Sequence, residues 1–147
     1  MKSARLLLAA GLSLFITSSF AGLVQPAPVI VEINPDGSGY ASGDLQTARN
    51  SKNRIEMIGC GSRYIETGTG VFKFAFCQAV MDDGSTDGVR AFCTAPDNEL
   101  IDAIQELNDT SFVTFAFDDN GTCTRIGAST QSFYLPKTKQ NRSNAKN

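Results

Sequence analysis

Three stretches of this chain decide its fold, and they read RIEMIGCGSRYI (54–65), VFKFAFCQAVM (71–81) and VRAFC (89–93). Each is rich in β-branched and aromatic residues and is bounded by turn-forming residues, which predicts three consecutive strands. Gly68 and Thr69 predict a two-residue hairpin loop between the first two, because glycine tolerates the positive φ that such a loop demands. A second turn, centred near Ser85, joins the second strand to the third.

These turns fix which residues face one another. The first loop sets Cys60 opposite Cys77, and the second turn brings Cys93 beside Cys77. Because side chains alternate between the faces of a strand, the cysteines share one face and a row of phenylalanines lies on the other. The sequence predicts that the phenylalanine face is the core and that the cysteines lie on the outer back of the sheet. The phenylalanines concerned are Phe72, Phe74, Phe76 and Phe92.

The four cysteines form an even set, Cys60, Cys77, Cys93 and Cys123, which predicts two disulfides in an oxidising compartment. We favour Cys60–Cys77 with Cys93–Cys123, since the first pair is opposed across the hairpin. Cys77–Cys93 with Cys60–Cys123 is the close alternative. A zinc site is disfavoured, because the chain has no histidine and no closely spaced cysteine pair.

Residues 1–21 have the pattern of a secretory signal peptide, with a basic head, a short apolar core and small residues before a cleavage site. We therefore expect a periplasmic or secreted protein with no stable membrane insertion after cleavage. Residues 37–136 carry 13 acidic and 7 basic side chains, and this acidic balance argues against nucleic acid as a partner.

The predicted organisation is a signal peptide (1–21), a proline-rich linker (22–39), a disulfide-stapled β domain (40–136) and a disordered basic tail (137–147). Within the linker, 29–33 has the composition of a short edge strand. Residues 41–53 are ambiguous and favour a strand or an irregular lead-in over a helix capped by Ser42.

Beyond the cysteine hairpin, an apolar stripe at helical spacing predicts one helix at about 95–108, capped by Thr94. Asn120-Gly121 then predicts a second hairpin that sets Phe117 opposite Thr124 and leaves Cys123 on the reverse of the phenylalanines. The fold class is mainly β (α+β), in the order β-β-β-α-β-β, as a small curved antiparallel sheet or a barrel. This order of elements resembles that of the OB-fold, which implies the barrel version.

An acidic turn offers the sharpest candidate for a metal. Asp82, Asp83 and Asp87 lie within a run that also holds two glycines, and calcium prefers several hard oxygen ligands from a flexible loop. Ordinary turn chemistry explains the same residues, and the spacing matches no complete calcium loop.

No catalytic constellation is recognisable, so the sequence favours a non-enzymatic role. Without histidine a nucleophilic serine needs a lysine base, and Lys73 has no serine assigned to it. Tyr64 and Arg63 are candidates for a binding surface, because aromatic and arginine side chains dominate contact energetics. The leading hypothesis is an exported binding or structural domain for an unknown protein or glycan, with no resident cofactor. The alternatives are a calcium-binding module or metal-dependent enzyme that uses the acidic turns, and a secreted inhibitor of a hydrolase.

Overall fold

The computed structural model describes residues 23–95 and 98–135, and the predicted signal peptide and basic tail lie outside them. The described chain is mainly β, as predicted, with two disulfides and a helix in the expected region. Its elements are β1 (Ile30–Ile33), β2 (Gly39–Asp44), α1 (Leu45–Arg49), β3 (Met57–Thr67), β4 (Gly70–Met81), β5 (Val89–Ala95), α2 (Asn98–Gln105), β6 (Phe112–Phe117), β7 (Cys123–Ser129) and a 3-10 turn (Ser132–Tyr134).

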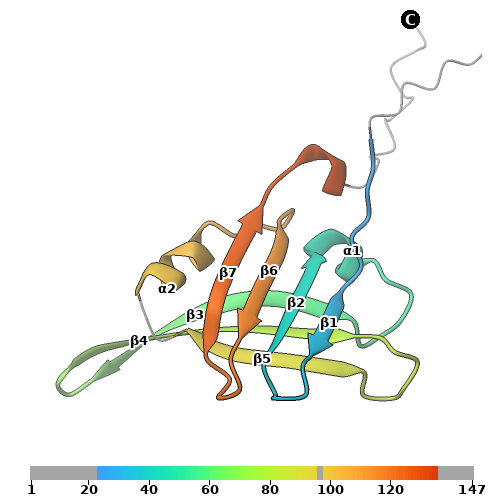
Figure 1. Cartoon of the computed structure of the whole chain (residues 1–147). Helices are drawn as coiled ribbons and strands as arrows, with labels where there is room; N and C mark the ends of the chain where they lie inside the picture. Colours follow the sequence, from blue (N-terminus) through green and yellow to red (C-terminus); the bar gives the residue numbers. More distant parts are fainter. Residues whose placement is uncertain (1–22, 96–97, 136–147) are drawn as a thin grey trace, which may run out of the picture.

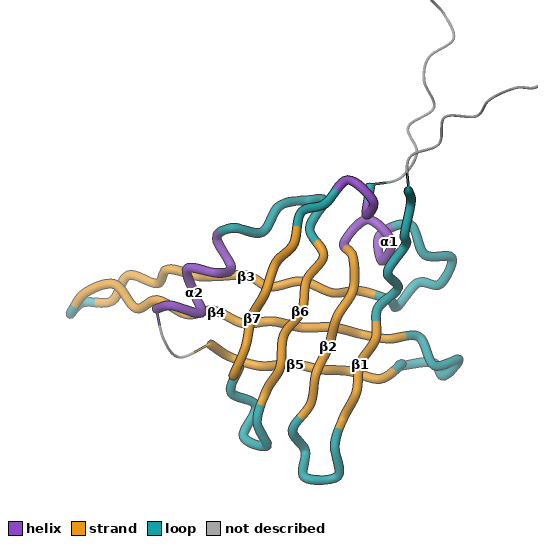
Figure 2. The backbone as a smooth tube through the Cα atoms, turned by 45° about the horizontal axis from the view of Figure 1, so that its top comes forward, coloured by secondary structure: helices purple, strands orange, loops and turns teal. Residues whose placement is uncertain are grey.

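The strands form two antiparallel sheets, ordered β1-β2-β6-β7 and β3-β4-β5. The sheets face each other with their strands crossing at a steep angle, and α2 covers one end (Figures 1 and 2). They are not closed into a barrel. The OB-like barrel is therefore the wrong one of the two predicted architectures, because two sheets stack where one was expected to curl on itself.

The registers of the cysteine hairpin are confirmed. Cys60 pairs with Cys77 and Cys77 with Cys93, and the loop between β3 and β4 consists of Gly68 and Thr69. The positive φ falls on Gly70 (+140°), the first residue of β4, and not on Gly68, the glycine that the sequence had favoured. Turn chemistry thus sets the pairing of all three strands.

The buried side of this sheet is the reverse of the prediction. The cysteine face packs against the other sheet, and the phenylalanine face points outward. Cys77 and Cys93 are fully buried, as is Phe115 of β6, whereas Phe72 and Phe92 are more than half exposed. The core combines small side chains of the β3-β4-β5 sheet with large ones of the β1-β2-β6-β7 sheet, and its main members are Ala75, Cys77, Ala79, Ala91, Cys93 and Ala95 facing Val31, Val113, Phe115 and Phe117.

Cys123 also lies on the core side, at 2% exposure, and not on the reverse of the phenylalanines. The pairing of Phe115 with Ile126 follows the predicted register, but an irregularity between Ala116 and Phe117 shifts it by one residue. Phe117 therefore pairs with Cys123 instead of Thr124. A one-residue shift moves a side chain to the other face of a strand, and here it carries the sulfur into the core.

The N-terminal part is more ordered than the sequence suggests. β1 lies within the segment expected to be a linker, which agrees with the edge strand read at 29–33, and it pairs with β2. α1 follows β2, and its cap is Asp44 rather than Ser42: the Asp44 carboxylate accepts from the Gln46 and Thr47 N–H groups. A five-residue helix held by one buried carboxylate leaves little signal in helix propensity.

α2 is shorter than predicted and starts later. Thr94, expected as its cap, belongs to β5, and residues 96–97 lie outside the described ranges. Ile101 and Ile104 of α2 are buried, so the helix closes one end of the core. Within the described residues, no helix combines the length and the apolar character needed to cross a membrane.

Candidate functional site

The outward side of the β3-β4-β5 sheet carries a row of exposed apolar side chains. We call it the aromatic face, and its members are Ile65, Phe72, Phe74, Phe76 and Phe92. Ile65, Phe72 and Phe92 are 51%, 57% and 53% exposed, while Phe74 and Phe76 are half-buried. Contiguous exposed apolar patches on small proteins mark interaction sites more often than single exposed residues do.

The rings of this face form a connected layer. The centroids of Phe74 and Phe76 are 5.7 Å apart, those of Phe76 and Phe92 are 6.1 Å apart, and both pairs are stacked. Phe76 lies over the bare backbone of Gly61, where an added Cβ would be 3.3 Å from the ring. The Arg63 guanidinium lies 5.4 Å from the Phe76 ring centre. The face is therefore held in shape by its own contacts.

The polar side chains around the rings are basic. Arg63 and Arg90 alternate with the apolar residues on the same side of the sheet, and both are exposed. Among the described residues the sole ion pair is Lys73–Asp102, so neither arginine has a carboxylate partner there. A basic apolar surface on an acidic chain complements a partner that presents carboxylates beside apolar groups.

The two residues predicted as a binding surface lie on opposite sides of β3. Arg63 belongs to the aromatic face, whereas Tyr64 points to the α2 side, where its hydroxyl accepts from Gln105 (2.7 Å). Lys73 lies 5.7 Å from the Tyr64 ring centre and forms a 3.2 Å ion pair with Asp102. Desolvation lowers the pKa of Lys73, but Asp102 and Tyr64 outweigh it and raise the pKa above its ordinary value. A lysine held protonated in this way is a poor general base.

The acidic turn uses its carboxylates locally. Asp82 accepts from the Gly84 N–H and Asp83 from the Ser85 N–H, each at 2.9 Å. Hydrogen bonds from Ser85 lower the pKa of Asp83. Within the described ranges, no three carboxylates bring their oxygens within 4.8 Å of one another. The calcium site with Asp82, Asp83 and Asp87 stays a hypothesis that needs a binding measurement.

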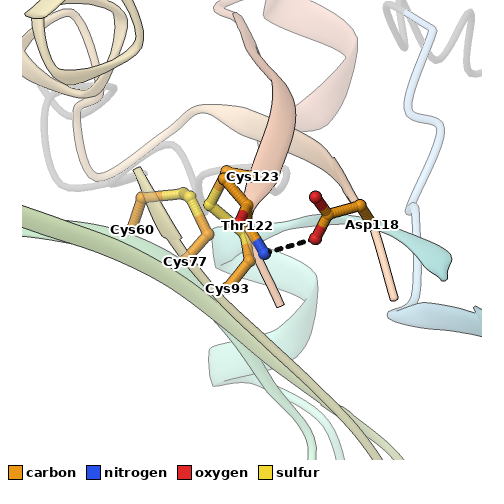
Figure 3. Close-up of a disulfide and its surroundings, with 6 residues drawn as sticks. All are labelled: Cys60, Cys77, Cys93, Asp118, Thr122 and Cys123. Atoms are coloured by element: carbon orange, nitrogen blue, oxygen red, sulfur yellow. Dashed lines mark hydrogen bonds between the residues drawn. A yellow bond between two sulfur atoms is a disulfide. The ribbon is translucent and has the colours of Figure 1, made fainter. Parts of the chain in front are cut away.

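The favoured disulfide pairing, Cys60–Cys77 and Cys93–Cys123, is confirmed. The first bond links neighbouring strands of one sheet, and the second joins the two sheets. Figure 3 shows the two bonds side by side, and the sulfurs of Cys77, Cys93 and Cys123 lie within 4.8 Å of one another. Because all four cysteines are oxidised to disulfides, this cluster of sulfurs is structural and offers no thiolate to a metal.

A shallow groove of about 470 Å³ lies between α1 and the segments at both ends of the described chain. Pro26, Pro28 and Tyr134 supply apolar walls, and Glu56 and Lys52 supply charge. The two Glu56 oxygens accept from the Val29 N–H (2.9 Å) and the Asn53 amide (2.8 Å), so this carboxylate holds the N-terminal segment in place. The acidic side chain of this groove, Glu56, therefore has a structural role.

No protein-family model, curated protein or solved structure matches this chain. The feature that sequence reasoning missed is the aromatic face, whose residues were assigned to the core. The alternation of phenylalanine with alanine and cysteine on β4 and β5 does define two faces, but it does not say which one is covered.

Proposed function

We propose that the chain is an exported, non-enzymatic binding domain whose contact surface is the aromatic face of the β3-β4-β5 sheet. The observation that supports this proposal most directly is the exposure of Phe72 and Phe92, each above 50%, on a sheet whose other face already forms the core. Leaving these rings in water forgoes about 1 kcal/mol each, which binding would recover. Export is part of the proposal and agrees with the two disulfides.

The partner that suits this face best is a protein that presents carboxylates beside apolar side chains. Phenylalanine rings offer contact area but no hydrogen-bonding group, so orientation on the face falls to Arg63 and Arg90. A neutral glycan needs a dense array of donors and acceptors, which the rings do not supply. A glycan partner is therefore the second choice, and the experiment below separates the two.

The test uses two matched double variants. Phe72→Asn/Phe92→Asn removes the two most exposed rings of the aromatic face, one at each end of the row. Ile30→Asn/Ile33→Asn removes two side chains of similar exposure, 45% and 47%, from β1 of the other sheet. We expect the immobilised parent and the β1 variant to retain the same proteins from the exported fraction, and the aromatic-face variant to retain at least about tenfold less. Equal retention by all three would refute the proposal. Binding on a glycan array that depends on Phe72 and Phe92 would assign the face to sugars.

A second candidate, a secreted hydrolase inhibitor, is favoured by one observation. The β3-β4 hairpin projects beyond the body of the molecule (Figure 1) and ends in the loop Gly68-Thr69. A projecting rigid loop is a suitable element for insertion into an enzyme cleft. Titration of secreted proteases and glycosidases with the parent and with Thr69→Arg tests it: inhibition that the tip substitution abolishes supports this role, and no inhibition across the panel rejects it.

A further inference from the structure

We infer that the chain forms a symmetric dimer in which the outer edge of β3 pairs with β3 of a second copy. This inference concerns the edge of the sheet and does not depend on the partner proposed for the aromatic face. β3 is an edge strand, since the sheet order is β3-β4-β5. Its outer half, residues 62–67, belongs to the projecting hairpin (Figure 2).

The backbone of this edge presents hydrogen-bonding groups outward. The Cα atoms of Cys60 and Cys77 are 4.0 Å apart, the spacing of a non-hydrogen-bonded antiparallel pair. Because the two kinds of pair alternate, Ser62, Tyr64 and Glu66 also have their N–H and C=O groups directed away from β4. The same alternation places the Thr94 N–H on the outer side of β5, where it donates to the Gly121 carbonyl (2.9 Å), which confirms the assignment independently.

This edge has little of the usual protection against pairing. Natural edge strands are blunted by proline, by charged side chains and lysine above all, by bulges or by a covering segment. The run SRYIET, residues 62–67, contains no proline or lysine, has a regular register with β4 throughout, and carries two charges of opposite sign, Arg63 and Glu66. Tyr64 and Ile65 are both more than half exposed. An open, regular edge with exposed apolar side chains is a template for another strand.

Charge selects one register. In a two-fold antiparallel pair, one residue of β3 lies opposite its own copy. Centring on Arg63 or Glu66 opposes like charges, which disfavours both. Centring on Ile65 places Ile65 against Ile65, Arg63 against Thr67, and Tyr64 against Glu66.

The Ile65-centred register adds a charge pair that the Tyr64-centred one lacks. Tyr64 pairs with Lys73 on β4, and the Lys73 ammonium lies over the Tyr64 ring. Glu66 of the second copy, opposite Tyr64, therefore extends a row that already holds Lys73. Two-fold symmetry creates this contact twice. In the Tyr64-centred register Glu66 faces Ser62 instead, one row away from Lys73.

In this arrangement the stacked sheets of the two copies lie at opposite ends of the joined strands, and the element of each copy nearest to the centre of pairing is α2, whose Gln105 donates to the Tyr64 hydroxyl (2.7 Å). The core covers β3 near Ile58, seven residues from the centre of pairing. At about 3.4 Å per residue, the two Ile58 positions lie about 48 Å apart at opposite ends of a six-stranded sheet. Odd-numbered residues of both strands share one side, so the two aromatic faces join into one surface.

Sedimentation equilibrium of the purified protein tests the dimer. We expect twice the chain mass at micromolar concentration. Ile65→Lys places two ammonium groups directly opposite each other and should raise the dissociation constant of the dimer at least about tenfold. Val71→Lys is the control, because Val71 is also exposed (68%, against 51% for Ile65) but lies on β4, one strand in from the edge, and should leave the dimer unchanged.

A charge exchange tests the register. Glu66→Lys should raise the dissociation constant of the dimer at least about tenfold. Adding Lys73→Glu to this variant should bring the dissociation constant back to within about threefold of the parent value. All four positions are exposed or lie at the surface, so circular dichroism and the melting temperature serve as folding controls. The inference would be overturned by any of three results. The protein could stay monomeric up to about 1 mM, Ile65→Lys could leave the dissociation constant unchanged, or the double variant could fail to recover the dissociation constant of the parent.

Discussion

The side of the β3-β4-β5 sheet that stabilises the fold can be tested with three substitutions. Phe115→Ala removes a ring from a fully buried site and should lower the free energy of unfolding by about 3–5 kcal/mol. This cost combines the lost transfer free energy of the ring with the cost of the cavity that it leaves. Phe92→Ala removes a ring that is 53% exposed. Full burial of such a ring is worth about 1.5–3 kcal/mol, so its loss should lower the free energy of unfolding by only about 1 kcal/mol, with no cavity term.

The third substitution enlarges a side chain on the opposite face of the same strand. Ala91 neighbours Phe92 but faces the core at 4% exposure, so Ala91→Leu adds three carbons to a buried position packed against the core. It should lower the free energy of unfolding by about 1–3 kcal/mol. Equilibrium urea unfolding with both disulfides intact measures the free energy of unfolding of all three variants. The values can be compared when the m-values are unchanged. A loss of 3 kcal/mol or more for Phe92→Ala, together with a neutral Ala91→Leu, would show that the aromatic face is the core after all.

Four further outcomes follow from the described contacts. Replacing Cys93 and Cys123 together by alanine should lower the free energy of unfolding by about 4 kcal/mol, because it opens a loop spanning a sequence separation of 30 residues, and urea unfolding measures this. Asp44→Ala should cost about 1–2 kcal/mol in the same assay, because the buried carboxylate caps α1. The pKa of Asp83 is lower in the folded chain than in the unfolded chain, where it is about 3.9, so the ionised carboxylate stabilises the fold above that pH. This stabilisation is lost as the pH falls through the folded pKa. In an acid titration, Asp83→Asn should therefore flatten the loss of stability between about pH 5 and pH 3. Because Asp82 and Asp83 already accept backbone N–H groups, we expect melting temperatures in calcium and in chelator to agree within about 1 °C; a rise of several degrees with calcium would establish a site in the 82–88 turn.

Local turn chemistry was sufficient to predict the strand pairing of the cysteine hairpin. A loop at Gly68-Thr69 and a turn near Ser85 fix every pair of β3, β4 and β5, and they set Cys60 opposite Cys77, the first of the favoured disulfides. These features depend on residues close in sequence, where the geometry of a tight turn leaves few alternatives.

The buried face was not predictable in the same way. Ranking by side-chain hydrophobicity selects the phenylalanines of β4, yet the alanine and cysteine side faces the core because Phe115 and Phe117 of the opposite sheet supply the volume. That sheet depends on pairing β2 with β6, whose residues 39–44 and 112–117 are far apart in sequence and share no turn signal. The aromatic face, and with it the candidate site, was therefore correctly separated from the cysteines but assigned to the wrong environment. Arg63 alone among the predicted binding residues lies on it.

The two ends of the described chain are held together, since the Gln25 N–H donates to the Phe133 carbonyl (2.8 Å). This junction lies at the opposite end of the molecule from the projecting hairpin (Figure 1). A tether attached through either end would thus present the hairpin to its surroundings, whether the support is a sensor chip or another folded unit. A circular permutant that joins these ends and opens the chain elsewhere should retain the same stacked sheets, because the junction needs only a short linker.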